Sequence, residues 1–208
     1  MQPPVIKNTL TELLCKHGLS EYAVSETQKY GHVTYFWNGN RSGKVDEKLE
    51  TYEEIPSDVI PFEQEPAMKS REITDHMIAA MESKKYDFLR CNFPNGDMVG
   101  HTGVISAVIT AMECVDESVG RIIKAADRLG YLVLVTADHG NADQMTETKK
   151  GKTSIRTAHS LNPVPFIVYD PDEKHELKEG KFGLANVAPT VATLLGLEKP
   201  ACWEESMV

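Results

Sequence analysis

One long amphipathic segment constrains the fold of this chain more than any other feature. Residues 103–129 carry apolar side chains at spacings of three and four, which predicts a helix with one buried face. Gly130 is expected to end this helix, and the run that follows, YLVLVT, is short and continuously apolar, as in a strand buried on both faces. The predicted buried stripe consists of Val104, Val108, Met112, Val115, Val119, Ile122 and Ala126.

Helices and strands are predicted to alternate along the whole chain. This alternation predicts an α/β protein with a mostly parallel sheet flanked by helices. The 208 residues suffice for one domain, taken as residues 1–208, with a real core. The acidic segment 46–69 is interrupted by prolines and is expected to be a long surface connection. Helices are predicted at 8–17, 70–83, 103–129 and 183–195, and strands at 32–37, 86–92, 131–136 and 164–170.

Charge and composition exclude several classes of function. The formal net charge is -9 without basic clusters, which disfavours binding to nucleic acid or to an anionic membrane surface. An anionic substrate would therefore need a local source of positive charge, and a divalent metal is the obvious candidate. No apolar run approaches the roughly 20 residues that span a bilayer, and the start has no apolar signal core, so a cytoplasmic location is expected. The four scattered cysteines are interpreted as reduced thiols: Cys15, Cys91, Cys114 and Cys202.

Acidic and imidazole side chains gather where predicted strands begin or end. Asp97 and His101, four residues apart, follow the second of these strands, Asp138 and His139 follow the third, and His159 precedes the fourth. Ligands of α/β sheets bind beyond the carboxyl ends of the strands, so these five side chains are expected to meet. Each pair alone could be a helix cap beside a surface histidine, but together they predict a metal site.

The adjacent pair Asp138 and His139 favours two ions over one. Neighbouring residues point in different directions, so each can bind its own ion, and two-metal sites place their ions about 3.5–4 Å apart. Gly140 is expected to permit a sharp turn here. Imidazole with carboxylate suits Mn²⁺ or Zn²⁺ better than Ca²⁺, and a set without cysteine argues against structural zinc. Judged by its residues alone, Lys29 has the character of a solvated surface lysine.

Four strings stand in this order along the chain: ETQKYGHVTYFWNG, NFPNGDMVGHTG, VTADHGNADQM and TAHSLNPVPFIVYD. Together they closely resemble the cofactor-independent (2,3-bisphosphoglycerate-independent) phosphoglycerate mutases of the alkaline phosphatase superfamily. The resemblance covers the chain from about residue 8 onward and includes the ending LANVAPTVATLLGLEKP. It implies an α/β fold with two divalent metals, and an isomerase of glycolysis that interconverts 3-phosphoglycerate and 2-phosphoglycerate through a phosphoserine.

The resemblance also implies a role for each matching residue. Asp97, His101 and His159 match the ligands of one metal, and Asp138 and His139 match ligands of the second. Lys29 matches a lysine that positions the transferred phosphoryl group, so it is the predicted catalytic and substrate-binding residue. Family members use manganese, or magnesium or cobalt in some lineages. The implied partner is a small phosphorylated substrate, phosphoglycerate.

Parts of the family pattern have no counterpart in this sequence. The serine nucleophile, a further aspartate ligand and the inserted transferase domain are missing, so the chain resembles the C-terminal segment of the phosphatase-type domain. The sheet would lack its first strands, and its open edge would invite self-association. The chain alone is therefore expected to be inactive. Two alternatives are a stand-alone metal-dependent phosphohydrolase and a non-catalytic metal-binding remnant.

Overall fold

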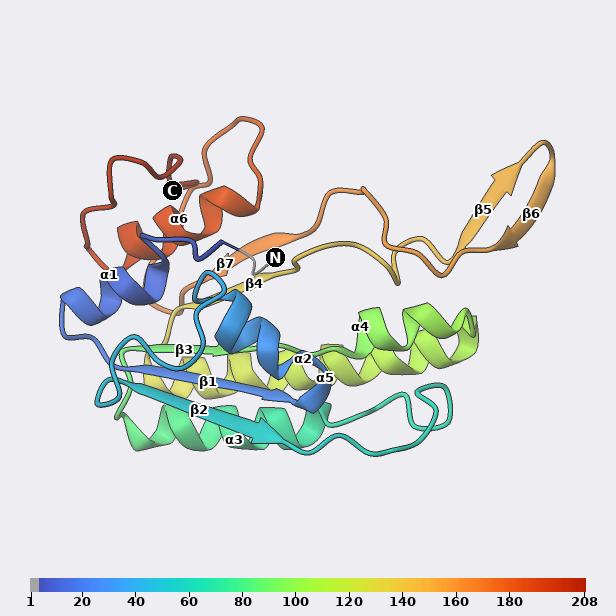
Figure 1. Cartoon of the computed structure of the whole chain (residues 1–208), viewed down its shortest axis with the longest axis horizontal. Helices are drawn as coiled ribbons and strands as arrows, with labels where there is room; N and C mark the ends of the chain where they lie inside the picture. Colours follow the sequence, from blue (N-terminus) through green and yellow to red (C-terminus); the bar gives the residue numbers. More distant parts are fainter. Residues whose placement is uncertain (1–3) are drawn as a thin grey trace.

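The computed structural model describes residues 4–208, which fold around a three-stranded parallel sheet (Figure 1). The strand order is β2-β1-β3, and Glu21 of β1 lies opposite both Glu50 of β2 and Phe88 of β3. Parallel neighbours need crossover connections, and helices supply them here. The predicted α/β class with a parallel sheet and flanking helices is confirmed. The strands are β1 (Glu21–Glu26), β2 (Glu50–Ile55) and β3 (Phe88–Cys91).

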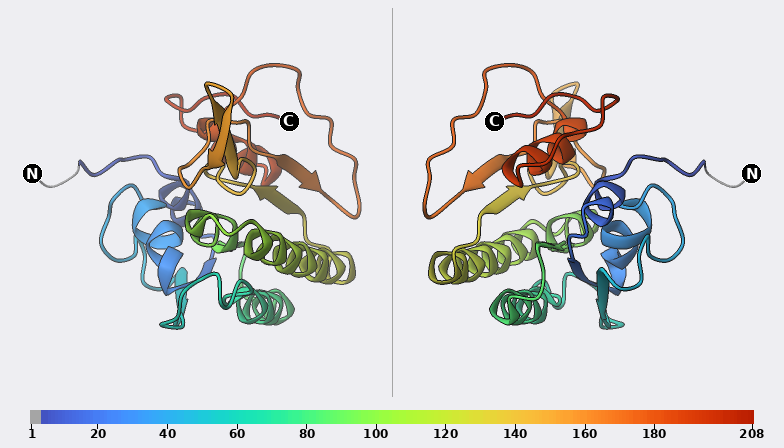
Figure 2. Two further views of the ribbon diagram at one scale, coloured as in Figure 1. Left: turned by 90° about the vertical axis from the view of Figure 1, so that its right-hand side faces the viewer. Right: turned by 90° about the vertical axis from the view of Figure 1, so that its left-hand side faces the viewer.

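Two long helices cover one face of this sheet. The helices α3 (Ser70–Ser83) and α5 (Ile105–Leu129) lie side by side behind it in the view of Figure 1, as the turned views of Figure 2 also show. Gly130 ends α5 in the left-handed conformation, at φ 73°, as predicted. The core between helices and sheet is built mainly from Tyr22, Val24, Ile73, Met77, Met81, Ile122 and Ala126.

A second pair of strands, which is antiparallel, lies next to two further helices. The strands β4 (Val133–Thr136) and β7 (Phe166–Tyr169) pair with Thr136 opposite Phe166. The prediction that the apolar run is buried on both faces was wrong, because β4 is only partly buried and ends exposed. Among residues 4–208, only one edge of β4 carries a paired strand. The adjoining helices α1 (Leu10–Lys16) and α6 (Val187–Leu194) share a core of Leu10, Leu14 and Val191.

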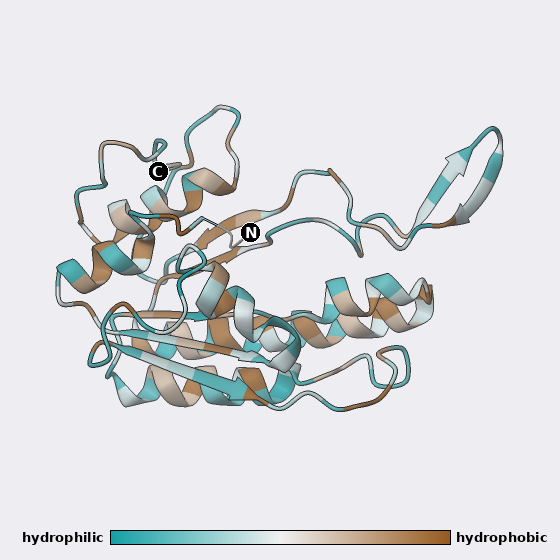
Figure 3. Ribbon diagram, viewed as in Figure 1, coloured by the Kyte–Doolittle hydropathy of each residue, from teal (hydrophilic) through white to brown (hydrophobic). Residues whose placement is uncertain are grey.

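A polar hairpin projects from the body of the molecule (Figures 1 and 3). Its strands, β5 (Thr146–Lys149) and β6 (Lys152–Ile155), are almost entirely exposed. None of the helices in residues 4–208 combines the length and apolarity that crossing a membrane requires. The remaining elements are α2 (Thr27–Gly31), a π-helix (His32–Phe36), α4 (Asn95–Met98) and two 3₁₀ turns (Gly100–Thr102 and Leu184–Asn186).

Two predictions about the first third of the chain were wrong. Residues 32–36 form a π-helix where a strand was expected at 32–37, and the strand of this region is β1, just upstream. The expected surface connection 46–69 contains β2, whose six residues pair in register with β1. Both strands are rich in glutamate, which concealed them from a search for apolar alternation.

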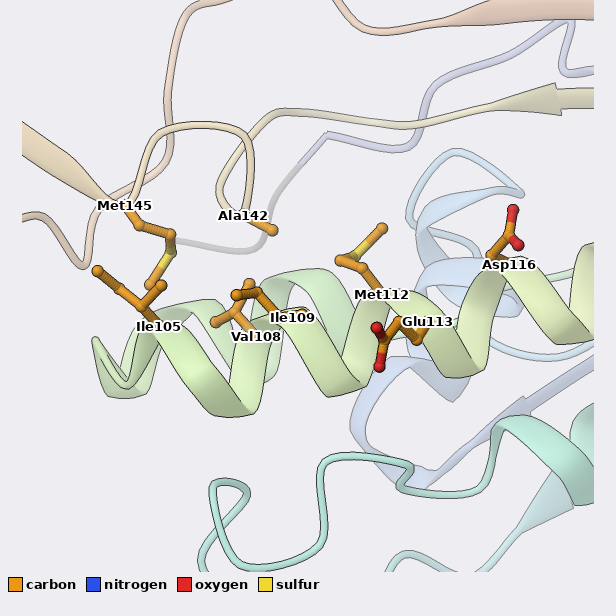
Figure 4. Close-up of a pocket in the computed structure, with 8 residues that line it drawn as sticks. All are labelled: Ile105, Val108, Ile109, Met112, Glu113, Asp116, Ala142 and Met145. Atoms are coloured by element: carbon orange, nitrogen blue, oxygen red, sulfur yellow. The ribbon is translucent and has the colours of Figure 1, made fainter.

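The buried face of α5 differs from the predicted stripe. Small residues such as Ala107, Ala111 and Ala125 are buried, whereas Met112 is 42% exposed. Met112 instead lines an apolar groove of about 500 Å³ between α5 and the loop that follows β4 (Figure 4). The groove is lined by Ile105, Val108, Ile109, Met112, Glu113, Asp116, Ala142 and Met145.

Candidate metal centre

The sheet topology explains why the predicted ligands meet. Asp97 lies on α4, which directly follows β3, and Asp138 and His139 follow β4. His159 precedes β7, which runs antiparallel to β4, so the start of β7 lies beside the end of β4. An isolated bridge between Gly140 and Ser160 continues this pairing past the strands. The ends of β3 and β4 and the beginning of β7 therefore come together.

The Asp97 carboxylate lies at the centre of this cluster. Its Oδ1 atom is 2.9 Å from Nε2 of His159 and 3.0 Å from Nε2 of His101. Its Oδ2 atom is 3.9 Å from Nε2 of His139. Asp97, His139 and His159 can each offer one ligand atom such that all three atoms lie within 4.8 Å of one another. Donor atoms as close together as these are suited to binding metal ions.

Asp138 lies at the margin of the cluster. Its side chain is 50% exposed, and its Oδ2 atom is 3.6 Å from Nε2 of His139. The rings of His139 and His159 stack with centroids 3.7 Å apart. The structure thus brings all five predicted residues to one place, while their assignment as ligands stays a prediction.

The hydrogen bonds of His101 favour a form that can bind a metal. Its Nδ1 atom is 2.7 Å from the carbonyl oxygen of Thr157, which can only accept, so Nδ1 donates in this contact. The lone pair of a neutral ring then lies on Nε2, which faces Asp97 Oδ1 and, at 3.2 Å, Nε2 of His159. Acceptor atoms that face one another repel unless a cation lies among them. The donor set therefore fits a divalent metal whose ligands are imidazole and carboxylate.

Lys29 belongs to the cluster rather than to the surface. It lies on α2, directly after β1, and its Nζ atom is 2.5 Å from Asp97 Oδ2. Burial alone would raise the pKa of Asp97, but hydrogen bonds from Lys29 and Asn141 outweigh it and lower the pKa to about 2. Burial, and then the Lys29 charge, lower the pKa of the nearby His32. The lowered pKa of Asp97 keeps its carboxylate ionised, as a metal ligand must be.

Sequence reasoning missed the polar residues that hold the cluster together. Asn141 donates to Asp97, and Asp143 accepts hydrogen bonds from Ser160 and Asn162. Their only sequence signal was their position inside the strings DHGNAD and AHSLN.

Gly140, which was expected to permit a sharp turn, is also a point of close packing. Its φ angle is not positive. A Cβ atom at this position would lie closer than 3.0 Å to both Ser160 Oγ and Asp143 Oδ1, a distance that real Cβ atoms essentially never show. Glycine is needed here for space and not for a left-handed turn.

Comparison with known families agrees with this geometry. Residues 1–199 match the metalloenzyme superfamily. The chain belongs to this superfamily. In this metalloenzyme chain, the carboxylate and imidazole donors lie next to the ends of β3 and β4 and the beginning of β7.

Curated relatives of this metalloenzyme are 2,3-bisphosphoglycerate-independent phosphoglycerate mutases. The Trypanosoma brucei brucei protein is 47% identical over 99% of this chain, and a probable mutase of Leptospira interrogans is 46% identical over 99%. A crystal structure of Leishmania mexicana phosphoglycerate mutase at low cobalt concentration matches 99% of the chain with a TM-score of 0.94 and 45% identity. The chain spans 40% of the length of each of these proteins.

Proposed function

We propose that this chain is the metal-binding, C-terminal part of a phosphoglycerate mutase that interconverts 3-phosphoglycerate and 2-phosphoglycerate through a phosphoserine. One observation carries the proposal: Asp97, His139 and His159 offer ligand atoms within 4.8 Å of one another. Identities of 46–47% to mutases over nearly the whole chain support the choice of reaction.

Each polar side chain of the cluster has a proposed task. Asp97, His101 and His159 hold one divalent ion, and Asp138 and His139 hold a second. When bound, such ions supply positive charge that stabilises a phosphoryl group during transfer. Lys29, buried beside Asp97, directs its ammonium group toward the same point and orients the anionic substrate. Thr157 fixes the ring of His101 through its carbonyl oxygen.

Manganese is the proposed metal, with magnesium or cobalt as alternatives. Nitrogen and oxygen donors without sulfur suit these ions, and cobalt was present with the structurally similar Leishmania mexicana enzyme. A cytoplasmic location is proposed for a glycolytic enzyme of this kind.

We further propose that the chain needs additional polypeptide for activity. Half-exposed ligands such as His159 and Asp138 leave the cluster open on one side. Among residues 4–208, β3 and β4 each pair along one edge only. A strand from another copy or from another polypeptide can bind at such an edge.

A chimera tests the proposed reaction directly. This chain would replace the matching 40% of the Trypanosoma brucei brucei relative, and conversion of 3-phosphoglycerate would be measured with Mn²⁺. The expected result is mutase activity that disappears with His159→Ala. A folded, manganese-loaded chimera without activity would contradict the proposal. The chain alone should form no 2-phosphoglycerate, and phosphate release from a simple ester would instead favour a phosphohydrolase.

A further inference from the structure

The loop that follows β4 makes contacts beyond the predicted ligands it carries. Asn141 is almost fully buried, at 4% exposed, two residues after His139. Its Nδ2 atom donates to Asp97 twice, to the carboxylate Oδ1 at 2.8 Å and to the backbone oxygen at 3.1 Å. One amide group thus holds both the side chain and the backbone of the central carboxylate.

The orientation of the Asn141 amide follows from its partners. Both Asp97 atoms are acceptors, so only the NH₂ group can face them. The Oδ1 atom then lies against Gly100, where it has no hydrogen-bond partner within residues 4–208. A Cβ atom at Gly100 would be 2.6 Å from this oxygen, so the loop and the 3₁₀ turn after α4 are closely packed.

Asp143, two residues after Asn141, binds the segment that carries His159 through two hydrogen bonds. Its Oδ2 atom accepts from Ser160 Oγ at 2.7 Å and from Asn162 Nδ2 at 2.6 Å. Ser160 is buried and directly follows His159 in the chain. The loop therefore carries two predicted ligands itself and fixes the segments of two others.

We propose that Asn141 and Asp143 are positioning residues that set the affinity of the cluster for a divalent cation, Asn141 through Asp97 and Asp143 through His159. The inference rests on the proposed function, because it takes the cluster to be a metal site. Hydrogen-bond partners of ligating groups fix their orientation, and losing such a partner typically weakens metal binding by about 10–100-fold.

The test measures Mn²⁺ affinity of the full chain by electron paramagnetic resonance, in which free Mn²⁺ gives a strong six-line signal. Asn141→Ala and Asp143→Ala are expected to weaken binding by about 10–100-fold. Asn38→Ala is a matched control, since Asn38 is buried, donates to Glu50 and Tyr52, and also has an unpaired Oδ1. Asp170→Ala is the second control, because Asp170 accepts from His175 at the far end of β7. Both controls should leave Mn²⁺ affinity unchanged, whatever they do to the melting temperature.

A double-mutant cycle separates positioning from general destabilisation. In an Asp97→Ala background, Asn141→Ala should cause little further loss of affinity, because the carboxylate that Asn141 orients is already gone. If Asn141→Ala does not fold, Asn141→Ser and Asp143→Asn replace the two alanine variants. Folded variants with unaltered affinity, or an equal Asn141→Ala loss in both backgrounds, would overturn the inference. An unaltered chain that binds no Mn²⁺ would overturn the proposed metal site as well.

Discussion

Arg90, on β3, is a buried cation outside the metal cluster. Its Nη1 atom is 2.6 Å from Glu21 Oε2, and its Nε atom donates to the carbonyl oxygen of Val33 at 2.9 Å. The guanidinium group lies 4.9 Å from the centre of the Trp37 ring. Glu21 is fully buried, and burial raises its pKa even though Arg90 opposes the shift.

Arg90→Met is expected to destabilise the chain strongly. It leaves the Glu21 carboxylate buried without its partner, which costs about 3–5 kcal/mol of unfolding free energy. Arg90 lowers the pKa of Glu21, so its removal raises this pKa further, and a carboxyl group whose pKa is raised in the folded state contributes more stability as pH falls through that pKa. Urea titrations should therefore show a smaller loss in mildly acidic than in neutral buffer. A loss below about 1 kcal/mol at neutral pH would show that the pair is not buried as described.

The cysteines should differ in reactivity because their surroundings differ. Burial, and then the charge of Glu21, raise the pKa of Cys15 to about 12, and burial raises the pKa of Cys91 to about 12. Cys202 is exposed. Since the thiolate is the reactive form, a maleimide should label Cys202 first, and labelling of Cys15 and Cys91 should keep accelerating as pH rises. Mass spectrometry of the native chain measures the order, and early labelling of Cys91 would contradict the packing of β3.

At the scale of elements, alanine substitutions at two glycines test how tightly the loop after β4 is packed. Gly140 in this loop is closely surrounded, whereas Gly120 in α5 is not. Gly140→Ala forces a Cβ atom against Ser160 Oγ, so it should cost about 1–3 kcal/mol of unfolding free energy and weaken Mn²⁺ binding. Gly120, inside α5, has open space where a Cβ atom would lie. Gly120→Ala should therefore stabilise the chain by about 0.5–1 kcal/mol without affecting the metal. Equal effects of the two changes in thermal melts would rule out this account.

Helices and strands were predicted best from the sequence where their residues are both apolar and buried. The long helix and its end at Gly130 were found, because both follow from spacing and backbone freedom. The buried face of α5 was misplaced, because alanines such as Ala107 and Ala111 leave little hydrophobic signal although they allow helices to approach closely. The strand β1 was missed because it starts and ends with a buried glutamate, Glu21 and Glu26, whose burial depends on partners distant in the sequence.

The candidate site was predictable only in part for the same reason. The five predicted ligands were found from the rule that loops at strand ends share one edge of a sheet. Residue patterns alone could not place the buried Lys29 beside Asp97, because that contact joins α2 to α4, which follow the neighbouring strands β1 and β3 but lie far apart in the sequence. The hydrogen bonds of Asn141 and Asp143 likewise depend on tertiary packing, which no local pattern encodes.

At the scale of the whole molecule, the three-stranded sheet and the β4–β7 pair pack against the same two hydrophobic cores. Leu89 of β3 and Val133 of β4 both pack against the core over α3 and α5. Phe88 of β3 and Leu134 of β4 both pack against the core of α1 and α6. The strands therefore lie in one layer between the same helices, yet they are not hydrogen-bonded to each other. Their facing edges are the part of this layer best suited to receive another strand.

Self-association through the facing edges of β3 and β4 is expected to increase with protein concentration. It should protect these two strands from hydrogen exchange and leave β2 unaffected. The outer strand β2 carries Glu50, Glu53 and Glu54, and like charges on a strand edge discourage pairing with a second copy. The edges of β3 and β4 are largely apolar and lack this protection. Hydrogen exchange at rising protein concentration should therefore slow in Phe88–Cys91 and Val133–Thr136 but not in β2, while sedimentation shows a growing dimer fraction. A chain that remains monomeric at every concentration, with unchanged exchange in β3 and β4, would contradict self-association through these edges.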